Sequence, residues 1–389
     1  MDSVVSHMLK EQITQWRHQI HQKPEFGFDE HETSAFVAQK LEEFGIEVHR
    51  NIGQTGVVGI LKCGSSNKSI GLRADMDALK INEKNEFEHA SKNEGLMHAC
   101  GHDGHTSMLL GAAKVLSESK NFNGTIYFIF QPCEEHGLGA KAMIADGLFA
   151  RWNIDAVYAM HNLPGIEAGS FATTSGSIMA SESNFEIEVI ATGGHAAMPY
   201  MGTDPIVVAS QIVCALQTIT SRNLDSIKEP AVISVTEFAT NGTVNVIPSR
   251  VTIKGDTRSF TDDVLNKIEK AIERVTAGCC IAAGVDYKYD FNNSFLSTIN
   301  SEAEALNAVT AAQTVVGEDR VNGSCHPFTI SEDFSFMQRE VPSCYILIGN
   351  GIGEVGGCAL HNALYDFNDE VLLIGVEFWK VLVEQQLKI

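Results

Sequence analysis

Three residue types that bind metal ions occur together in the stretch 98–105, His-Ala-Cys-Gly-His-Asp-Gly-His. Cys100 and His102 are two residues apart, so in an extended segment both side chains leave the backbone on one face and can reach the same ion. A buried cysteine with surface histidines would give the same composition, because free cysteine is among the most buried residue types. The stretch therefore indicates a metal site only if further ligands come from elsewhere in the chain.

Two adjacent glutamates, Glu134 and Glu135, follow the apolar run 125–130, which predicts a strand covered on both faces. Burying two carboxylates at such a strand end is favourable only where cations neutralise them. Because adjacent side chains point in different directions, one can bind a metal while the other takes a proton from metal-bound water. A solvated pair on a turn is the alternative interpretation.

Further polar residues stand where predicted strands end. His161 follows the apolar run 155–160, and Asp75 follows the run 69–73. Ligands of open α/β sheets bind beyond the carboxyl ends of strands, so these positions are those expected of a site. His361 comes after the glycine-rich stretch 349–357. Each histidine alone could equally be structural. Asp75 and Asp77 could orient metal-binding imidazoles, and for Asp77 a helix cap is an equal alternative.

Predicted strands and helices must position these side chains. They alternate over residues 46–160, which predicts an α/β domain. Between 185 and 291 the predicted order changes to β-α-β-β-α-β, the ferredoxin-like α+β pattern. The α/β character then resumes, so the second pattern is an insertion. We expect an α/β domain over 1–180 and 293–389, with a central mixed sheet flanked by helices, and an inserted domain over 181–292.

Composition limits the kinds of binding partner and the cellular compartment that are compatible with this sequence. The 389 residues carry a formal net charge of -21, which disfavours binding to nucleic acid or to an anionic membrane surface. The nine cysteines are scattered, as is usual in a reducing compartment. No window has the apolar character of a signal peptide or a membrane span. The expected location is the cytoplasm.

Six motifs, spread in order over nearly the whole chain, resemble those of a family of metallo-amidohydrolases. That family includes hippurate hydrolase, bacterial N-acyl-amino-acid amidohydrolases (aminoacylases) and the plant hydrolases of indole-acetyl amino-acid conjugates. The motifs are RADMDAL at 73–79, HACGHDGH at 98–105, QPCEE at 131–135, MHN at 160–162, GGHAAMP at 193–199 and NVIP at 245–248.

The resemblance implies hydrolysis of the amide bond of small N-acyl amino acids, giving a carboxylic acid and a free amino acid, with two divalent metal ions per subunit. The implied base is Glu134, and the implied metal ligands are Cys100, His102, Glu135, His161 and His361. Zinc or manganese is expected, and cobalt or nickel would also fit such ligands. A metallo-carboxypeptidase or dipeptidase of the same architecture is the alternative. A binding protein with a structural metal is disfavoured, because Glu134 would be a spare carboxylate.

By the same resemblance, the α/β domain is the metal-binding catalytic domain. The inserted domain is a lid that also dimerises, which implies a homodimer. His195 would stabilise the oxyanion of its own or the partner's site. Asn245 and Arg258 would hold the substrate, and the planar fork of Arg258 suits a carboxylate. Asp75 would orient a metal-binding imidazole. Without the resemblance, His195 is more simply a turn histidine and Arg258 a surface ion-pair partner.

Overall fold

The computed structural model describes residues 3–389, with side chains from residue 7 onward. It divides into two compact units. The first unit comprises Met1–Ile178, Ile299–His326 and Asp333–Ile389, and the second comprises Met179–Thr298 and Pro327–Glu332. Among the helices of the described residues, none combines the length and the apolar character needed to cross a membrane.

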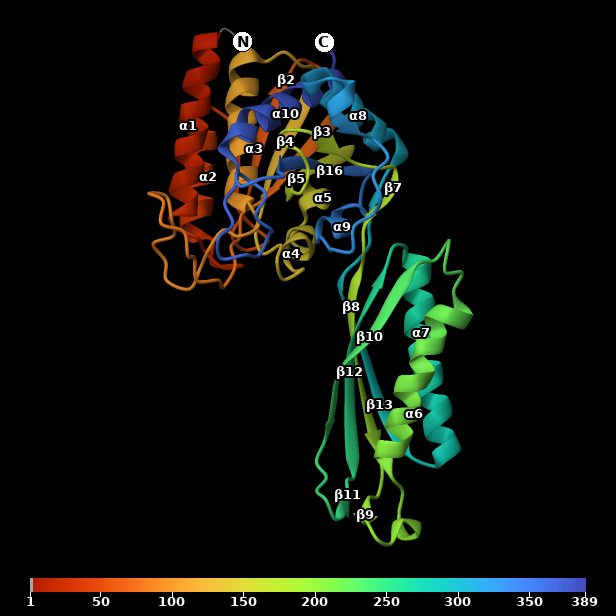
Figure 1. Cartoon of the computed structure of the whole chain (residues 1–389). Coiled ribbons are helices and arrows are strands. Elements are labelled where there is room, and N and C mark those ends of the chain that lie inside the picture. The colour runs from red at the N-terminus through yellow and green to blue at the C-terminus, as the bar shows by residue number, and fades with distance from the viewer. Residues whose placement is uncertain (1–2) are drawn as a thin grey trace. The chain divides into compact units, whose positions relative to one another are not determined.

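An eight-stranded mixed sheet forms the centre of the first unit (Figure 1). In spatial order its strands are β1 (Glu47–Ile52), β2 (Gly56–Cys63), β4 (Gly124–Gln131), β3 (Ser69–Asp75), β5 (Ala156–Pro164), β16 (Ser343–Gly351), β6 (Phe171–Ala172) and β15 (Val321–Asn322). The inner strands β4, β3, β5 and β16 run parallel to one another. Their carboxyl ends therefore meet at one edge of the sheet.

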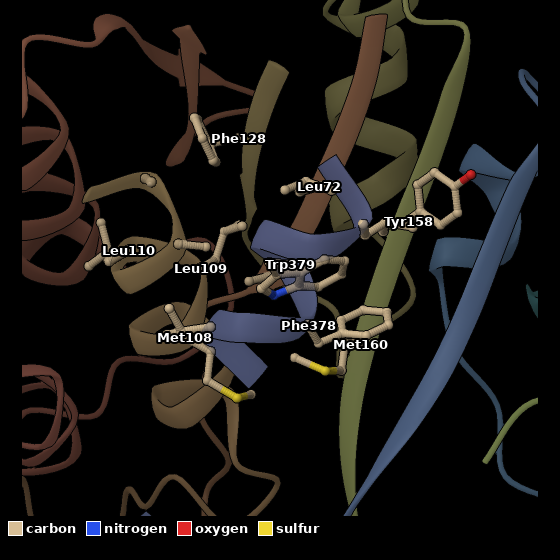
Figure 2. Packing of buried hydrophobic residues seen from close by; sticks show 14 of the residues in the cluster. Leu72, Met108, Leu109, Leu110, Phe128, Tyr158, Met160, Phe378 and Trp379 are labelled. Atoms are coloured by element: carbon tan, nitrogen blue, oxygen red, sulfur yellow. The ribbon is translucent and has the colours of Figure 1, made fainter. Parts of the chain in front are cut away.

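Helices pack on this sheet and supply the core. They are α1 (Ser3–His21), α2 (His31–Glu43), α3 (His102–Ser119), α4 (Gly139–Ala145), α5 (Leu148–Arg151), α8 (Glu302–Val316), α9 (Phe334–Met337) and α10 (Leu372–Gln386). Figure 2 shows Met108 of α3 near Phe378 and Trp379 of α10, with Met160 of β5 beside them. Helices α3 and α10 approach closely because Gly375 has no side chain, and a Cβ there would lie 2.1 Å from the sulfur of Met108.

The second unit is an antiparallel sheet with two helices on one side (Figure 1). Its strands are β10 (Ala231–Thr240), β12 (Arg250–Ser259), β8 (Glu182–Ile190) and β13 (Asp286–Phe295), and its helices are α6 (Pro205–Thr218) and α7 (Asp262–Ala283). Phe185, Ile187 and Val189 alternate along β8 and are buried. Along the chain these elements follow the ferredoxin-like order, so the predicted fold class is confirmed.

Candidate metal centre

The candidate ligands of the first unit are delivered by the parallel strands. Glu135 follows the end of β4, and His161 lies near the end of β5. His102 begins α3, directly after Gly101, whose φ of +91° is a left-handed conformation that favours glycine. His361 follows β16. The carboxyl-end edge of one sheet therefore gathers residues that lie far apart in the sequence.

The five predicted metal ligands converge at this edge. The sulfur of Cys100 lies 3.4 Å from Nε2 of His161. Oε2 of Glu135 lies 3.4 Å from Nε2 of His361, and its Oε1 lies 3.9 Å from Nε2 of His102. The potential ligand atoms of Cys100, Glu135 and His361 all lie within 4.8 Å of one another. Such spacing suits side chains that share metal ions.

Two buried atoms at the centre have the chemistry to bind a cation. Nε2 of His102 and Oε1 of Glu135 are both buried and have no hydrogen-bond partner among the described residues. Nδ1 of His102 faces only acceptors, the backbone oxygen of Asp77 at 2.9 Å and its Oδ1 at 3.1 Å, so Nδ1 carries the proton. Nε2 is therefore the ring nitrogen left to bind a metal, and it faces the carboxylate of Glu135 at 3.9 Å. A divalent cation that displaced the proton from Nε2 would satisfy both atoms.

His161 is also oriented by a hydrogen bond at Nδ1, with its Nε2 facing another candidate ligand. Its Nδ1 donates to the backbone oxygen of Asn162 at 2.6 Å, which leaves the Nε2 lone pair facing Cys100. His105 lies beside it, accepts from the backbone N–H of Asn162 at 2.9 Å and donates from Nδ1 to Asp75 at 2.7 Å. Ligand atoms of Asp75, His102, His105 and His161 also lie within 4.8 Å of one another.

Asp77 supports two candidate ligands at once. Its Oδ1 and backbone oxygen hold His102, and its Oδ2 accepts the backbone N–H of Glu135 at 3.1 Å. Asp75, expected from the sequence to orient an imidazole, bonds His105 and lies 3.8 Å from Nε2 of His102. The pair of acids two residues apart in Asp75-Met76-Asp77 was the signal for both roles, but the sequence could not say which acid holds which ring.

Glu134 is a further buried carboxylate beside the candidate ligands, and it is not assigned as one of them. It is only 6% exposed, and one of its oxygens lies within 4.8 Å of ligand atoms of His102 and Glu135. Its Oε1 is 3.4 Å from the backbone N–H of Asp333. A carboxylate in this place can accept a proton from a water molecule bound between the ligands.

Burial and neighbouring charges set the protonation of the centre. Burial raises the pKa of the Cys100 thiol well above its ordinary value, and the charges of Glu135 and Glu134 add to this effect. Burial opposes a charge on His102, but Asp75 and Asp77 outweigh it and raise the pKa of His102 to about 10. Because a metal ligand must be deprotonated, a divalent cation binding here would displace protons from both side chains.

The remaining predicted site residues belong to the second unit. His195 is exposed in β9 (Gly194–His195), opposite Val246 of β11 (Val246–Ile247), and the N–H of Ala196 donates to the backbone oxygen of Asn245 at 3.1 Å. His195 and Asn245 are therefore neighbours on a short two-stranded ribbon.

Strand β12 begins at Arg250, shortly after the ribbon strand β11, and Arg258 lies near its opposite end. Its guanidinium forms ion pairs with Glu182 at 2.7 Å and Asp256 at 3.0 Å, and it donates to the hydroxyl of Ser331 at 2.8 Å. Arg258 is thus already neutralised by carboxylates of its own unit.

Comparison with known proteins gives consistent matches over most of the chain. The family model for peptidase family M20/M25/M40 matches residues 71–385. A hippurate hydrolase from Campylobacter jejuni is 42% identical over 380 residues, which are 98% of this chain and 98% of the relative. The IAA-amino acid hydrolase ILR1-like 2 of Arabidopsis thaliana is 36% identical, covering 96% of this chain and 84% of the relative.

A crystal structure of similar fold belongs to the Bacillus subtilis YXEP protein, described as a dinuclear metal-binding peptidase of the M20 family. Its TM-score to this chain is 0.86 at 28% sequence identity, and the match covers 98% of this chain and 99% of that one.

Proposed function

Because this chain belongs to peptidase family M20/M25/M40, we propose that it is a metal-dependent hydrolase that cleaves the amide bond of N-acyl amino acids, releasing a carboxylic acid and a free amino acid. The observation that carries the proposal is the pair of unsatisfied buried atoms, Nε2 of His102 and Oε1 of Glu135, with the carboxylate of Glu134 beside them. A structural metal site would have no use for that additional acid.

The proposed cofactor is a pair of divalent metal ions, with zinc or manganese expected first and cobalt or nickel as further candidates. The residues that would hold them are Cys100, His102, Glu135, His161 and His361. When bound, such ions lower the pKa of water toward about 7 and polarise the amide carbonyl. Glu134 would take the proton from the attacking water and return it to the leaving amine, so that one carboxylate serves both proton transfers.

We also propose roles for the second unit and for the assembly. His195 would stabilise the developing oxyanion, while Asn245 and Arg258 would hold the substrate. Arg258 would have to exchange at least one of its ion pairs for the substrate carboxylate. A homodimer formed through the inserted domain is supported by Val232 and Phe238 on edge strand β10, which are 46% and 42% exposed. The nine free cysteines support a location in the cytoplasm, where thiols stay reduced.

A substrate panel with one variant tests the proposal. The purified protein should hydrolyse N-benzoyl and N-acetyl amino acids faster than free dipeptides, and a chelator should abolish the activity. Glu134→Gln should keep the metal content and lose about 10²–10⁴-fold in kcat, whereas Glu86→Gln at an exposed position should keep both. Faster turnover of dipeptides would favour the carboxypeptidase or dipeptidase alternative. Full activity in Glu134→Gln would refute the assignment of the base.

A further inference from the structure

Helix α1 places a charged side chain in the interior of the first unit. Arg17 is 0% exposed, and its Nη1 lies 3.0 Å from Oδ2 of Asp103 and 3.0 Å from Oδ1 of Asp366. Its Nε donates to Asp369, and its Nη2 is 3.1 Å from Nε2 of His89. Burying a guanidinium is costly unless carboxylates neutralise it, so a position with three acidic partners is an organised one.

The acidic partners of Arg17 come from the two segments that carry candidate metal ligands. Asp103 directly follows His102 in the first turn of α3, whereas Asp366 and Asp369 come soon after His361. One planar guanidinium therefore bonds both segments at the same time. Arg17 itself cannot be a ligand, because its guanidinium stays charged and offers only N–H donors.

His21, one turn further along α1, strengthens the hold on α3. Its Nδ1 lies 2.8 Å from Oδ2 of Asp103, and its Nε2 lies 3.2 Å from Oε1 of Glu83. Burial would keep this ring neutral, but Asp103 and Glu83 outweigh it and raise the pKa of His21 to about 9. Two cations thus share one oxygen of Asp103. Helix α3 has no side-chain N-cap at Gly101, and these bonds hold its first turn together with the bond of His102 to Asp77.

We propose that Arg17 is a positioning residue of the metal centre, which sets the spacing of His102 and His361 through Asp103 and Asp366 and thereby sets metal affinity. The inference rests on the proposed metal centre but not on the identity of the substrate. Groups that orient ligands without touching the metal typically contribute 10–100-fold to affinity. A guanidinium that spans two ligand-bearing segments should act in the same way.

The test compares Arg17→Met with a matched control on the same helix. Lys10 forms an exposed ion pair with Glu370 at 2.6 Å, so Lys10→Met removes a contact between α1 and the segment beside Asp369 without touching Asp103 or Asp366. Metal affinity is measured by competition with a chromophoric chelator, after circular dichroism has shown that each variant is folded. The cobalt-loaded proteins are also compared by absorption, because ligand-field and thiolate bands report the geometry of the centre.

Arg17→Met should bind metal about 10–100-fold more weakly and shift the cobalt spectrum. Arg17→Lys should recover part of the affinity, and Lys10→Met should match the parent. A folded Arg17→Met protein with the parental affinity and spectrum, and only a lower melting temperature, would overturn the inference and leave Arg17 a structural residue.

A second variant serves if Arg17→Met does not fold. The side chain of Asp366 is 32% exposed. Asp366→Asn keeps the size of this side chain and removes its charge, which weakens one of the three ion pairs of Arg17. We expect a reduction in affinity of up to about tenfold, and an unchanged affinity and spectrum would overturn the inference. If the parent protein binds no metal, the proposed function itself falls. If the parent binds metal and both variants bind equally well, only the role of Arg17 falls.

Discussion

Glu30 offers a test of the electrostatics of the segment 132–135, which follows β4 and contains Glu134 and Glu135. This carboxyl group is 0% exposed, and it accepts hydrogen bonds from the backbone N–H of Cys133 at 2.8 Å and from the hydroxyl of Thr55 at 2.6 Å. Burial raises the pKa of Glu30 to about 7, from an ordinary value of 4.5. We predict that Glu30→Gln makes the protein more stable than the parent at neutral and alkaline pH.

The sign follows from which state binds the proton more tightly. With a raised pKa in the folded protein, the stabilisation from Glu30 is fully present below pH 4.5 and is lost as the pH rises through about 7. Since one pKa unit corresponds to about 1.4 kcal/mol, the parent should lose about 3 kcal/mol relative to the glutamine variant over this interval. Glutamine can keep both hydrogen bonds, because the hydroxyl of Thr55 can accept as well as donate.

Tryptophan fluorescence during urea unfolding measures the effect. All three tryptophans, Trp16, Trp152 and Trp379, belong to the first unit, so the signal reports the unit that contains Glu30. The parent, Glu30→Gln and the exposed control Glu86→Gln are compared at several pH values between about 4.5 and about 8. The advantage of Glu30→Gln over the parent should grow with pH, and that of the control should stay flat. A constant or shrinking advantage of Glu30→Gln would refute the reasoning.

Two further predictions concern the residues around the metal centre. Asp77→Asn should weaken metal binding by about 10–100-fold, because this carboxylate holds two candidate ligands; chelator competition measures the loss, and parental affinity would contradict the contact. Gly104→Ala should lower the free energy of unfolding by about 1–3 kcal/mol, because its Cβ would lie 2.3 Å from the ring of Phe367. The control is Gly278→Ala in α7, where a new Cβ meets no other atom. Thermal denaturation measures both variants, and equal melting temperatures of the Gly104→Ala and Gly278→Ala proteins would disprove the clash.

The fold class was predictable because its signals are local. The buried positions of β8 alternate in the sequence, and the apolar run of β4 is continuous, as expected for a strand covered on both faces. Polar residues placed directly after such runs led to Glu134 and His161, since parallel strands bring their carboxyl ends together. The structure brings these residues close to one another, and their roles as base and ligand remain predictions.

Contacts between distant side chains were not predictable in this way. Glu30 looks like a loop residue, and nothing near it in the sequence indicates Cys133 or Thr55. Arg17 had a weak signal, because it lies on the same helical face as Ile13 and Ile20 and is a charged residue on an apolar stripe. Its three acidic partners are 86 to 352 residues away, so only the folded chain reveals why the charge is tolerated.

The position of strand β16 has a consequence for how the protein folds during its synthesis on the ribosome. It lies between β5 and β6, yet it is synthesised after the whole ferredoxin-like insertion. Until residue 351 has emerged, β5 has an open hydrogen-bonding edge where its neighbour belongs. An unfinished chain therefore carries an aggregation-prone strand through much of translation, and the main sheet can close only when synthesis is nearly complete.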